Sequence, residues 1–186
     1  MVTKERRPGT APWSMTASEW IGRHPVVSEV PPYLQDMLDM SVDVLETRHR
    51  RYLAGAPPGG APPVGYHHPG FVTVDQDYRP DLNFVLVRPD TILVLDGDDA
   101  LVGGVENGNL WVHPEHRGRG VATAIHVVVV EADLPVMRSP TAYSEGGHAT
   151  RVAAHRVLCD RAWERGDDVH PEAALDYGLG APSPGF

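Results

Sequence analysis

The chain has 186 residues and a net charge of −9, and 41% of its residues are hydrophobic. This length and composition are typical of a soluble globular protein with one domain and a sizeable core. The acidic balance argues against a nucleic-acid binder, which needs a basic face to neutralise phosphates. A cationic substrate is compatible with the charge, although acidity alone mainly concerns solubility.

The single cysteine, Cys159, excludes an intramolecular disulfide and fits a reducing compartment. We expect it to be a small buried apolar side chain rather than a nucleophile. The N-terminus carries no apolar run of signal-peptide length, and the valines Val127–Val130 are too few to span a membrane. We therefore expect a cytoplasmic protein that binds neither membranes nor nucleic acid.

Residues 1–30 are polar and punctuated by prolines, which predicts an N-terminal arm, either flexible or lying as a strap on the domain. Residues 31–70 hold one helix and a glycine- and proline-rich loop that is neither helix nor central strand. Apolar residues recur at helical spacing over Pro32–Leu53. Four acidic residues on another face of that helix indicate either a solvated face or an acidic wall that attracts an amine; they are Asp36, Asp39, Asp43 and Glu46.

Residues 71–166 form the predicted core of the domain, which begins with a series of strands. Short connections between these strands predict antiparallel pairing rather than crossover units. The predicted strands are Phe71–Asp75, Leu82–Val87, Thr91–Leu95, Leu101–Val105 and Asn109–Val112.

The segment Val121–Asp133 is ambiguous, because its four consecutive valines favour a strand while its alanines and length favour a helix. We interpret it as a helix buried on a sheet. A strand over Val136–Tyr143 and a helix over His148–Arg165 follow, the helix ending at Gly166. The tail, residues 167–186, contains one short helical piece, PEAALDY.

The turn between the last strand and the first of these helices combines two arginines with two glycines, Arg117-Gly118-Arg119-Gly120. Glycines let backbone N–H groups converge, and a helix N-terminus adds its dipole, which together favour a bound pyrophosphate. A P-loop is excluded because its lysine is missing. A dinucleotide-binding fingerprint is excluded because Thr123 stands where the third glycine belongs.

This segment resembles motif A of the GCN5-related N-acetyltransferase (GNAT) superfamily, which reads (Gln/Arg)-x-x-Gly-x-(Gly/Ala) between a strand and a helix. Arg117, Gly120 and Ala122 occupy its fixed places, and the lead-in Leu110–Glu115 is similar to the family's strand four. The resemblance implies an α/β (α+β) fold, with a mixed, largely antiparallel central sheet flanked by helices. The N-terminal helical segment would be an addition to it.

The resemblance also implies an acetyl-CoA-dependent N-acetyltransferase that transfers the acetyl group by direct attack of an amine. The acceptor would be a small molecule or a peptide. The cofactor-binding residues would be the strand Leu110, Trp111 and Val112, which pairs with the pantetheine, and the turn Arg117, Gly118, Arg119, Gly120, Val121, Ala122 and Thr123, which holds the pyrophosphate.

Glu106 stands six residues before Val112, where family members often carry a general base at the start of strand four. It is equally interpreted as part of a hairpin turn. The family's tyrosine acid is missing from the helix His148–Arg165, and Tyr143 is our substitute, with His148 or His155 as alternatives.

The tail departs from the family as well, because no strand pair is visible in residues 167–186. The missing tyrosine and this tail favour an alternative, a non-catalytic acyl-CoA-binding or interaction module. The short tail is also compatible with a homodimer. The histidine pairs His67-His68 and His113 with His116 lack the spacing or cysteine partner of a zinc site, so we expect no metal.

Overall fold

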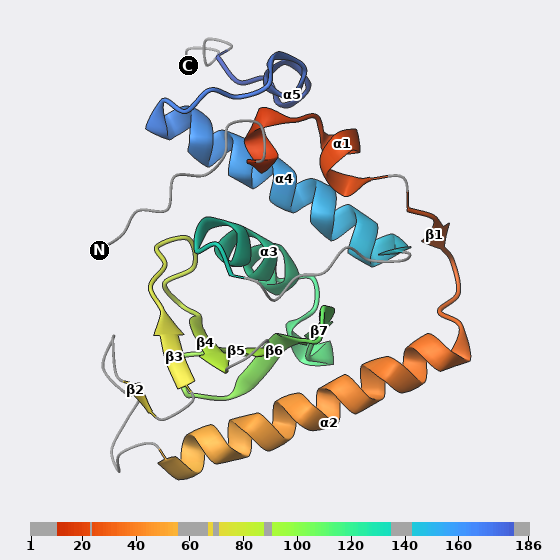
Figure 1. Ribbon diagram of the computed structural model, residues 1–186, viewed down its shortest axis with the longest axis vertical. Coiled ribbons are helices and arrows are strands. Elements are labelled where there is room, and N and C mark those ends of the chain that lie inside the picture. Colours follow the sequence, from red (N-terminus) through yellow and green to blue (C-terminus); the bar gives the residue numbers. More distant parts are fainter. Residues whose placement is uncertain are drawn as a thin grey trace. The chain divides into compact units, whose positions relative to one another are not determined.

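The computed structural model describes residues 11–22, 24–55, 67–68, 71–87, 91–134 and 143–180 (Figure 1). The chain divides into two compact units, one formed by Val27–Thr141 and one by Met1–Val26 together with Ala142–Phe186. The first unit contains a β-sheet and two long helices, and the second is largely helical. The segment predicted as one core, residues 71–166, is thus shared between the two units, because its last helix packs with the N-terminal segment.

The sheet of the first unit has six strands, and every neighbouring pair in it is antiparallel. The five strands predicted between Phe71 and Val112 are confirmed, with ends that differ by at most one residue. Their order is sequential from β2 to β7. The strands are β2 (His67–His68), β3 (Phe71–Val74), β4 (Asn83–Val87), β5 (Thr91–Leu95), β6 (Leu101–Glu106) and β7 (Asn109–Val112).

Helices α2 (Pro32–Gly55) and α3 (Val121–Glu131) cover opposite faces of this sheet (Figure 1). Side chains alternate between the two faces along each strand. Leu93 and Leu95 therefore share a buried cluster with Leu45 of α2, whereas Ile92 and Val94 share another with α3. The coarse prediction of an α+β fold with helices flanking a largely antiparallel sheet is confirmed for the described residues.

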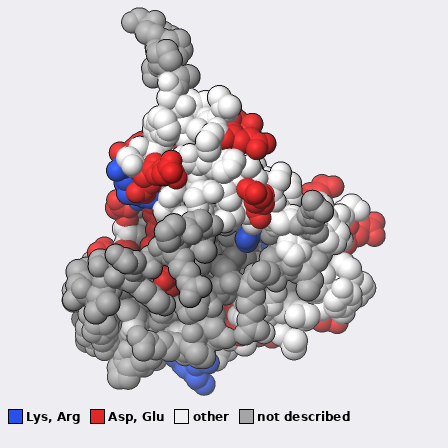
Figure 2. Space-filling view, turned by 45° about the horizontal axis from the view of Figure 1, so that its top comes forward, with Lys and Arg blue, Asp and Glu red and all other residues white. Residues whose placement is uncertain are grey.

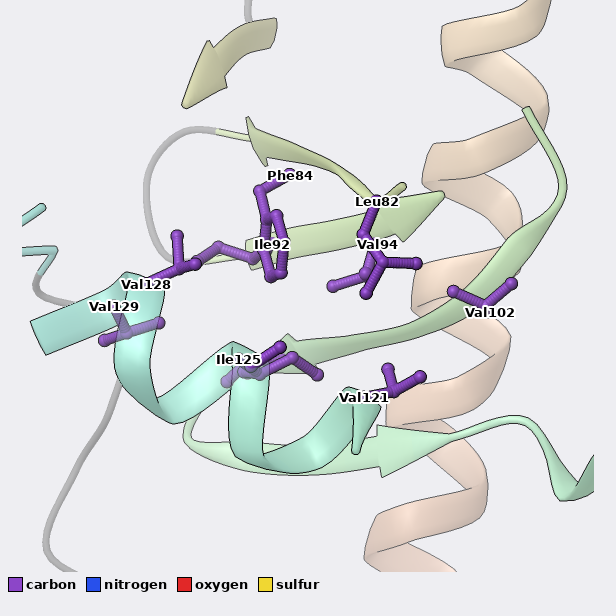
Figure 3. Close-up of a cluster of buried hydrophobic side chains, with 11 residues drawn as sticks. Leu82, Phe84, Ile92, Val94, Val102, Val121, Ile125, Val128 and Val129 are labelled. Atoms are coloured by element: carbon purple, nitrogen blue, oxygen red, sulfur yellow. The ribbon is translucent and has the colours of Figure 1, made fainter. Parts of the chain in front are cut away.

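The cluster under α3 explains why its valine-rich sequence forms a helix. Val121, Ile125, Val128 and Val129 project toward the apolar side chains of the strands (Figure 3). The lower helix propensity of valine costs less than about 1 kcal/mol per residue. Burial of one valine side chain contributes roughly 1.5–3 kcal/mol, so tertiary packing outweighs the local preference for strand.

Two consecutive glycines in β6 allow both helices to approach the sheet closely. A Cβ at Gly103 would lie 2.9 Å from the Trp111 carbonyl oxygen of β7 and 3.3 Å from Val121 Cγ1 of α3. A Cβ at Gly104 would lie 2.8 Å from Leu45 Cδ2 of α2 and would also collide with the carbonyl oxygen of Ile92. Gly103 thus leaves space for α3 on one face of the sheet, and Gly104 leaves space for α2 on the other.

The acidic residues of α2 are all exposed, as expected of a solvated face. With 3.6 residues per turn, they project from the side of α2 opposite to Ser41 and Leu45, which face the sheet. Acidic side chains are also spread over the face shown in Figure 2, with few basic ones among them. The carboxylates of α2 therefore do not line the side of the helix that faces the sheet.

The second unit is built around α4 (Glu145–Arg165), which contacts the 3₁₀ turn η1 (Pro12–Ser14), the short helix α1 (Ala17–Ile21) and α5 (Pro171–Tyr177). The predicted helices over His148–Arg165 and PEAALDY are confirmed. Ser144 caps α4 by accepting from Gly147 N, so that helix begins three residues earlier than predicted.

Residues 11–22 form helical turns, although we predicted an arm or strap without secondary structure there. Thr16 and Glu19 make a capping box, in which each side chain bonds the backbone N–H of the other. This signal was present in the sequence. A two-stranded sheet pairs β1 (Val26–Val27) with β8 (Tyr143–Ser144). The predicted strand Val136–Tyr143 lies outside the described residues except for Tyr143, as does most of the glycine- and proline-rich loop.

Candidate functional site

The turn before α3 has the backbone conformation that its glycines predict. Gly118 and Gly120 have φ angles of +73° and +77°, which side chains with a Cβ rarely adopt. Gly120 is the N-cap of α3 and offers no side chain to its first turn. The first helical bond runs from Ala124 N to Gly120 O, so the N–H groups of residues 121–123 have no intrahelical acceptor. These three N–H groups point out of the N-terminal end of α3, toward the turn.

Strand β7 forms an edge of the six-stranded sheet, and its register shows which groups face outward. His113 N donates to Val102 O over 2.9 Å, in line with the pairing of Val112 with Gly103. Backbone groups alternate in direction along an antiparallel strand. The N–H and C=O groups of Leu110 and Val112 therefore point away from β6, toward the side of β7 on which no described strand lies.

Arg117 reaches this same edge. Its Nε donates to the outward-facing carbonyl of Val112 at 3.2 Å, and its side chain is exposed. The guanidinium thus lies where the edge of β7 meets the turn, and it keeps further N–H donors for a ligand. Arg119, in the middle of the turn, is also exposed.

The structure adds one cation that the sequence analysis missed, Arg79 in the connection between β3 and β4. Its Nη1 donates to Arg119 O at 3.0 Å, across forty positions of sequence. Its Nε and Nη2 bind both carboxylate oxygens of Asp81, at 2.7 and 2.6 Å. No sequence motif marks this residue, because only the fold brings the two connections together.

Glu106 does not stand at the start of β7 as expected, because it is the last residue of β6. Asn107 and Gly108 both have positive φ angles and form a two-residue hairpin turn, so Glu106 pairs with Asn109. The hairpin interpretation is therefore confirmed. Val112 is three positions after Asn109, which places the Glu106 backbone roughly 10 Å from that of Val112 along the strand direction.

The carboxylate of Glu106 is held by the buried hydroxyl of Ser41 on α2. Ser41 Oγ lies 3.3 Å from Glu106 Oε2 and 2.9 Å from Met37 O, and Asn109 Nδ2 donates to it at 3.0 Å. A hydroxyl has one hydrogen, so the carboxylate and the carbonyl share it. Oε1 of Glu106 has no hydrogen-bond partner within the described part of the chain and is open to a substrate or water.

The proposed acid, Tyr143, belongs to β8 in the helical unit, and its side chain lies outside the described residues. Its alternative His148 is half-buried in α4 and lines an open groove with Glu19 and Val152. That groove is formed only by residues of α1, Gly22 and α4. None of these residues belongs to the turn or to β7.

The alternative acid His155 is a structural residue, because its ring is completely buried. Nε2 lies 3.0 Å from Pro12 O and 3.2 Å from Met15 O, and carbonyl oxygens only accept hydrogen bonds. Nε2 must therefore carry the proton. In the neutral ring Nδ1 then accepts from the Tyr177 hydroxyl at 2.8 Å. Both ring nitrogens are occupied, so His155 has no proton to offer a substrate.

Burial lowers the pKa of His155 below its ordinary value of 6.5. The unfolded chain therefore binds a proton at higher pH than the folded chain does. The contribution of the neutral His155 ring to the free energy of unfolding is complete above about pH 6.5. It decreases as the pH falls from there toward the pKa of His155 in the folded chain. We expect the Tm to decrease more between about pH 7.5 and about pH 5.5 in the native chain than in His155→Gln. Equal decreases in calorimetry would contradict this assignment.

Cys159 is fully buried beside His155, as predicted for a small apolar side chain. Burial raises the pKa of its thiol to about 12, so it stays protonated and is a poor nucleophile. Within the described ranges, no three His, Cys, Asp or Glu side chains form a set that could hold a metal ion. None of the helices in that part of the chain has the length and apolar character needed to cross a membrane.

Comparison with known proteins identifies no relatives: no protein-family model, curated protein or solved structure matches this chain.

Proposed function

We propose that this protein is an acyl-CoA-dependent N-acyltransferase that moves an acetyl group from acetyl-CoA to an amine. The observation that carries the proposal combines three features of the described residues: β7 at the edge of the sheet, a turn with φ angles of +73° and +77° at Gly118 and Gly120, and a helix N-terminus whose first N–H groups have no intrahelical acceptor. This combination follows the order of GNAT motif A, which the sequence of residues 110–122 resembles.

Each part of this arrangement suits one part of acetyl-CoA. The N–H groups of residues 121–123, with Arg117 and Arg119, suit the pyrophosphate. The outward N–H and C=O of Leu110 and the C=O of Val112 suit the amide groups of pantetheine, which can pair as an added strand. The Val112 N–H is then available to the thioester carbonyl, where negative charge develops during attack.

The reaction forms one C–N bond and breaks one C–S bond. The neutral amine attacks the thioester carbonyl, the tetrahedral intermediate collapses, and the thiolate of CoA leaves and takes a proton. The amine nitrogen loses a proton in the process. Glu106 serves as the base through water, since the strand geometry separates its backbone from that of Val112 by roughly 10 Å. Tyr143 stays our proposed acid.

One alternative has specific support, a non-catalytic acyl-CoA-binding module. Helix α4 contains no tyrosine, and the segment after it forms α5 rather than the strand pair typical of GNAT enzymes. The Ser41 hydroxyl also donates a hydrogen bond to one carboxylate oxygen of Glu106. Such a module would bind acetyl-CoA and release no thiol.

A matched pair of glycine variants tests the turn. Gly118 and Gly166 have φ angles of +73° and +77°, and a Cβ at either position would meet no atom within 4 Å. Alanine at either position costs about 1–2 kcal/mol of backbone strain. We expect only Gly118→Ala to weaken acetyl-CoA binding, by roughly tenfold or more, because the distorted turn loses a charge-assisted hydrogen bond. Isothermal titration calorimetry measures both; no binding by the native chain would refute the proposal.

Turnover separates the enzyme from the binding module. The assay follows thiol release from acetyl-CoA with a polyamine, an aminoglycoside and a peptide with a free α-amine. For an enzyme, Glu106→Gln should slow release by roughly 10²–10⁴-fold while its Kd for acetyl-CoA stays that of the native chain. Binding with no release on any of the three amines would favour the module.

A further inference from the structure

We infer that Arg79 is a phosphate-binding residue of the candidate site, supplied by the β3–β4 connection from outside the sequence motif. This inference rests on the proposed function, because it names a further residue for the same ligand. It goes beyond the motif, whose own residues all lie between Leu110 and Thr123. The ligand group would be a phosphate of the 3′-phospho-ADP part of CoA.

The connection that carries Arg79 is fixed by its own hydrogen bonds. Gln76 Oε1 accepts from Arg79 N at 2.8 Å, and Gln76 Nε2 donates to Arg79 O at 2.7 Å and to Leu82 O at 3.1 Å. Leu82 itself is buried in the cluster under α3. The backbone of Arg79 is therefore anchored to the core, and little conformational entropy remains to be lost when a ligand binds.

The guanidinium is oriented as firmly as the backbone. Asp81 holds Nε and Nη2 in a bidentate pair, and Nη1 donates to the carbonyl of Arg119. A guanidinium has five N–H donors, so three are used and two remain, one on each terminal nitrogen. The side chain is 26% exposed, so the guanidinium is only partly shielded from solvent. A Cβ at Gly120 would lie only 3.4 Å from Nη1, so the guanidinium borders the turn itself.

The charges around this guanidinium indicate an anion as the ligand. Arg79 lies beside the N-terminus of α3, whose partial charge is positive, and it contacts the backbone of the turn that carries Arg117 and Arg119. Asp81 pairs with the Arg79 guanidinium, and a phosphate at the mouth of the turn would meet the two remaining Arg79 donors together with the positive end of the α3 dipole. Arginine suits this role because its planar fork can bind two phosphate oxygens at once.

The experiment measures binding of CoA and dephospho-CoA by calorimetry to the native chain, Arg79→Gln, Arg79→Lys and a control. The control is Arg165→Gln, which removes a similar ion pair between residues two apart, Arg165 with Asp167, in the helical unit. We expect Arg79→Gln to bind CoA roughly ten- to hundredfold more weakly, and the control to bind as the native chain does. Arg79→Lys should recover part of the loss, because it keeps the charge without the fork.

The two ligands show which phosphate Arg79 binds. If the preference for CoA over dephospho-CoA is lost, Arg79 binds the 3′-phosphate, and if both affinities fall alike, it binds the pyrophosphate. Native affinity in Arg79→Gln, or an equal loss in the control, would overturn the inference. If Arg79→Gln does not fold, native affinity in Arg79→Lys overturns it instead. If the native chain binds neither ligand, it is the proposed function that fails.

Discussion

Replacing Gly104 with alanine is expected to lower the free energy of unfolding by about 1–3 kcal/mol, the usual range for overpacking a core. The added methyl group would lie 2.8 Å from Leu45 Cδ2 and would also collide with the Ile92 carbonyl, which belongs to the neighbouring strand. The Leu45 side chain can change rotamer. The Ile92 carbonyl cannot move without weakening the hydrogen bonds between β5 and its neighbouring strands. Urea unfolding followed by circular dichroism measures the change.

Gly97→Ala is the matched control, because a Cβ there would meet no atom within 4 Å. Its effect should stay within about 0.5 kcal/mol. Leu45→Ala on its own should destabilise by about 2–5 kcal/mol, since Leu45 is completely buried. The double variant should be more stable than the sum of both changes predicts, but it should not recover fully, because the clash with Ile92 persists. Strict additivity would show that Leu45 does not limit the space at Gly104.

Replacing His155 with phenylalanine should destabilise the helical unit by roughly 1–3 kcal/mol for each buried polar group that loses its partner. The ring size is similar, so the effect isolates the hydrogen bonds. The carbonyls of Pro12 and Met15 lose the His155 donor, and Pro12 O keeps only the local bond from Met15 N at 3.3 Å. The Tyr177 hydroxyl loses its acceptor. The link to Pro12 connects α4 with a segment 143 residues away, so its loss weakens a long-range contact of the helical unit.

Native-state hydrogen exchange measures this effect, because amide protection can be compared between α4 and the sheet. We expect protection to fall first in α4 and η1. His148→Phe is the control, since His148 is only half-buried and the same exchange of ring types should matter less there. Equal protection of α4 in the native chain and in His155→Phe would show that these hydrogen bonds do not hold the helical unit.

The periodicity of apolar residues was sufficient to predict α2, the strands from β3 to β7 and α4, because each of them buries one regular face. Helix α3 was ambiguous for a physical reason. Val127–Val130 prefer extended backbone locally, and only burial against the sheet decides for helix. The segment around Thr16 was missed although its capping box could be read in the sequence. The division into two units was not predictable from composition, because α4 pairs with residues more than a hundred positions earlier.

The candidate site was predicted in part. Gly118 and Gly120 adopt the positive φ angles that their position before a helix predicts. We predicted Glu106 at the start of β7, but it is the last residue of β6, since Asn107 and Gly108 turn the chain directly after it. Arg79 and Ser41 were missed because neither belongs to a local pattern. Their roles depend on contacts across forty and sixty-five positions, which a single sequence does not show.

The valines of α3 have a consequence for the chain when it is not folded. Ile125–Val130 contains no proline, no glycine and no Asp, Glu, Lys or Arg, and it is rich in β-branched residues. Segments of this kind form intermolecular cross-β structure once they are exposed. In the native state Ile125–Val130 is part of the buried helix α3. Any event that opens α3 therefore sets refolding in competition with aggregation, and heat denaturation becomes irreversible as protein concentration rises.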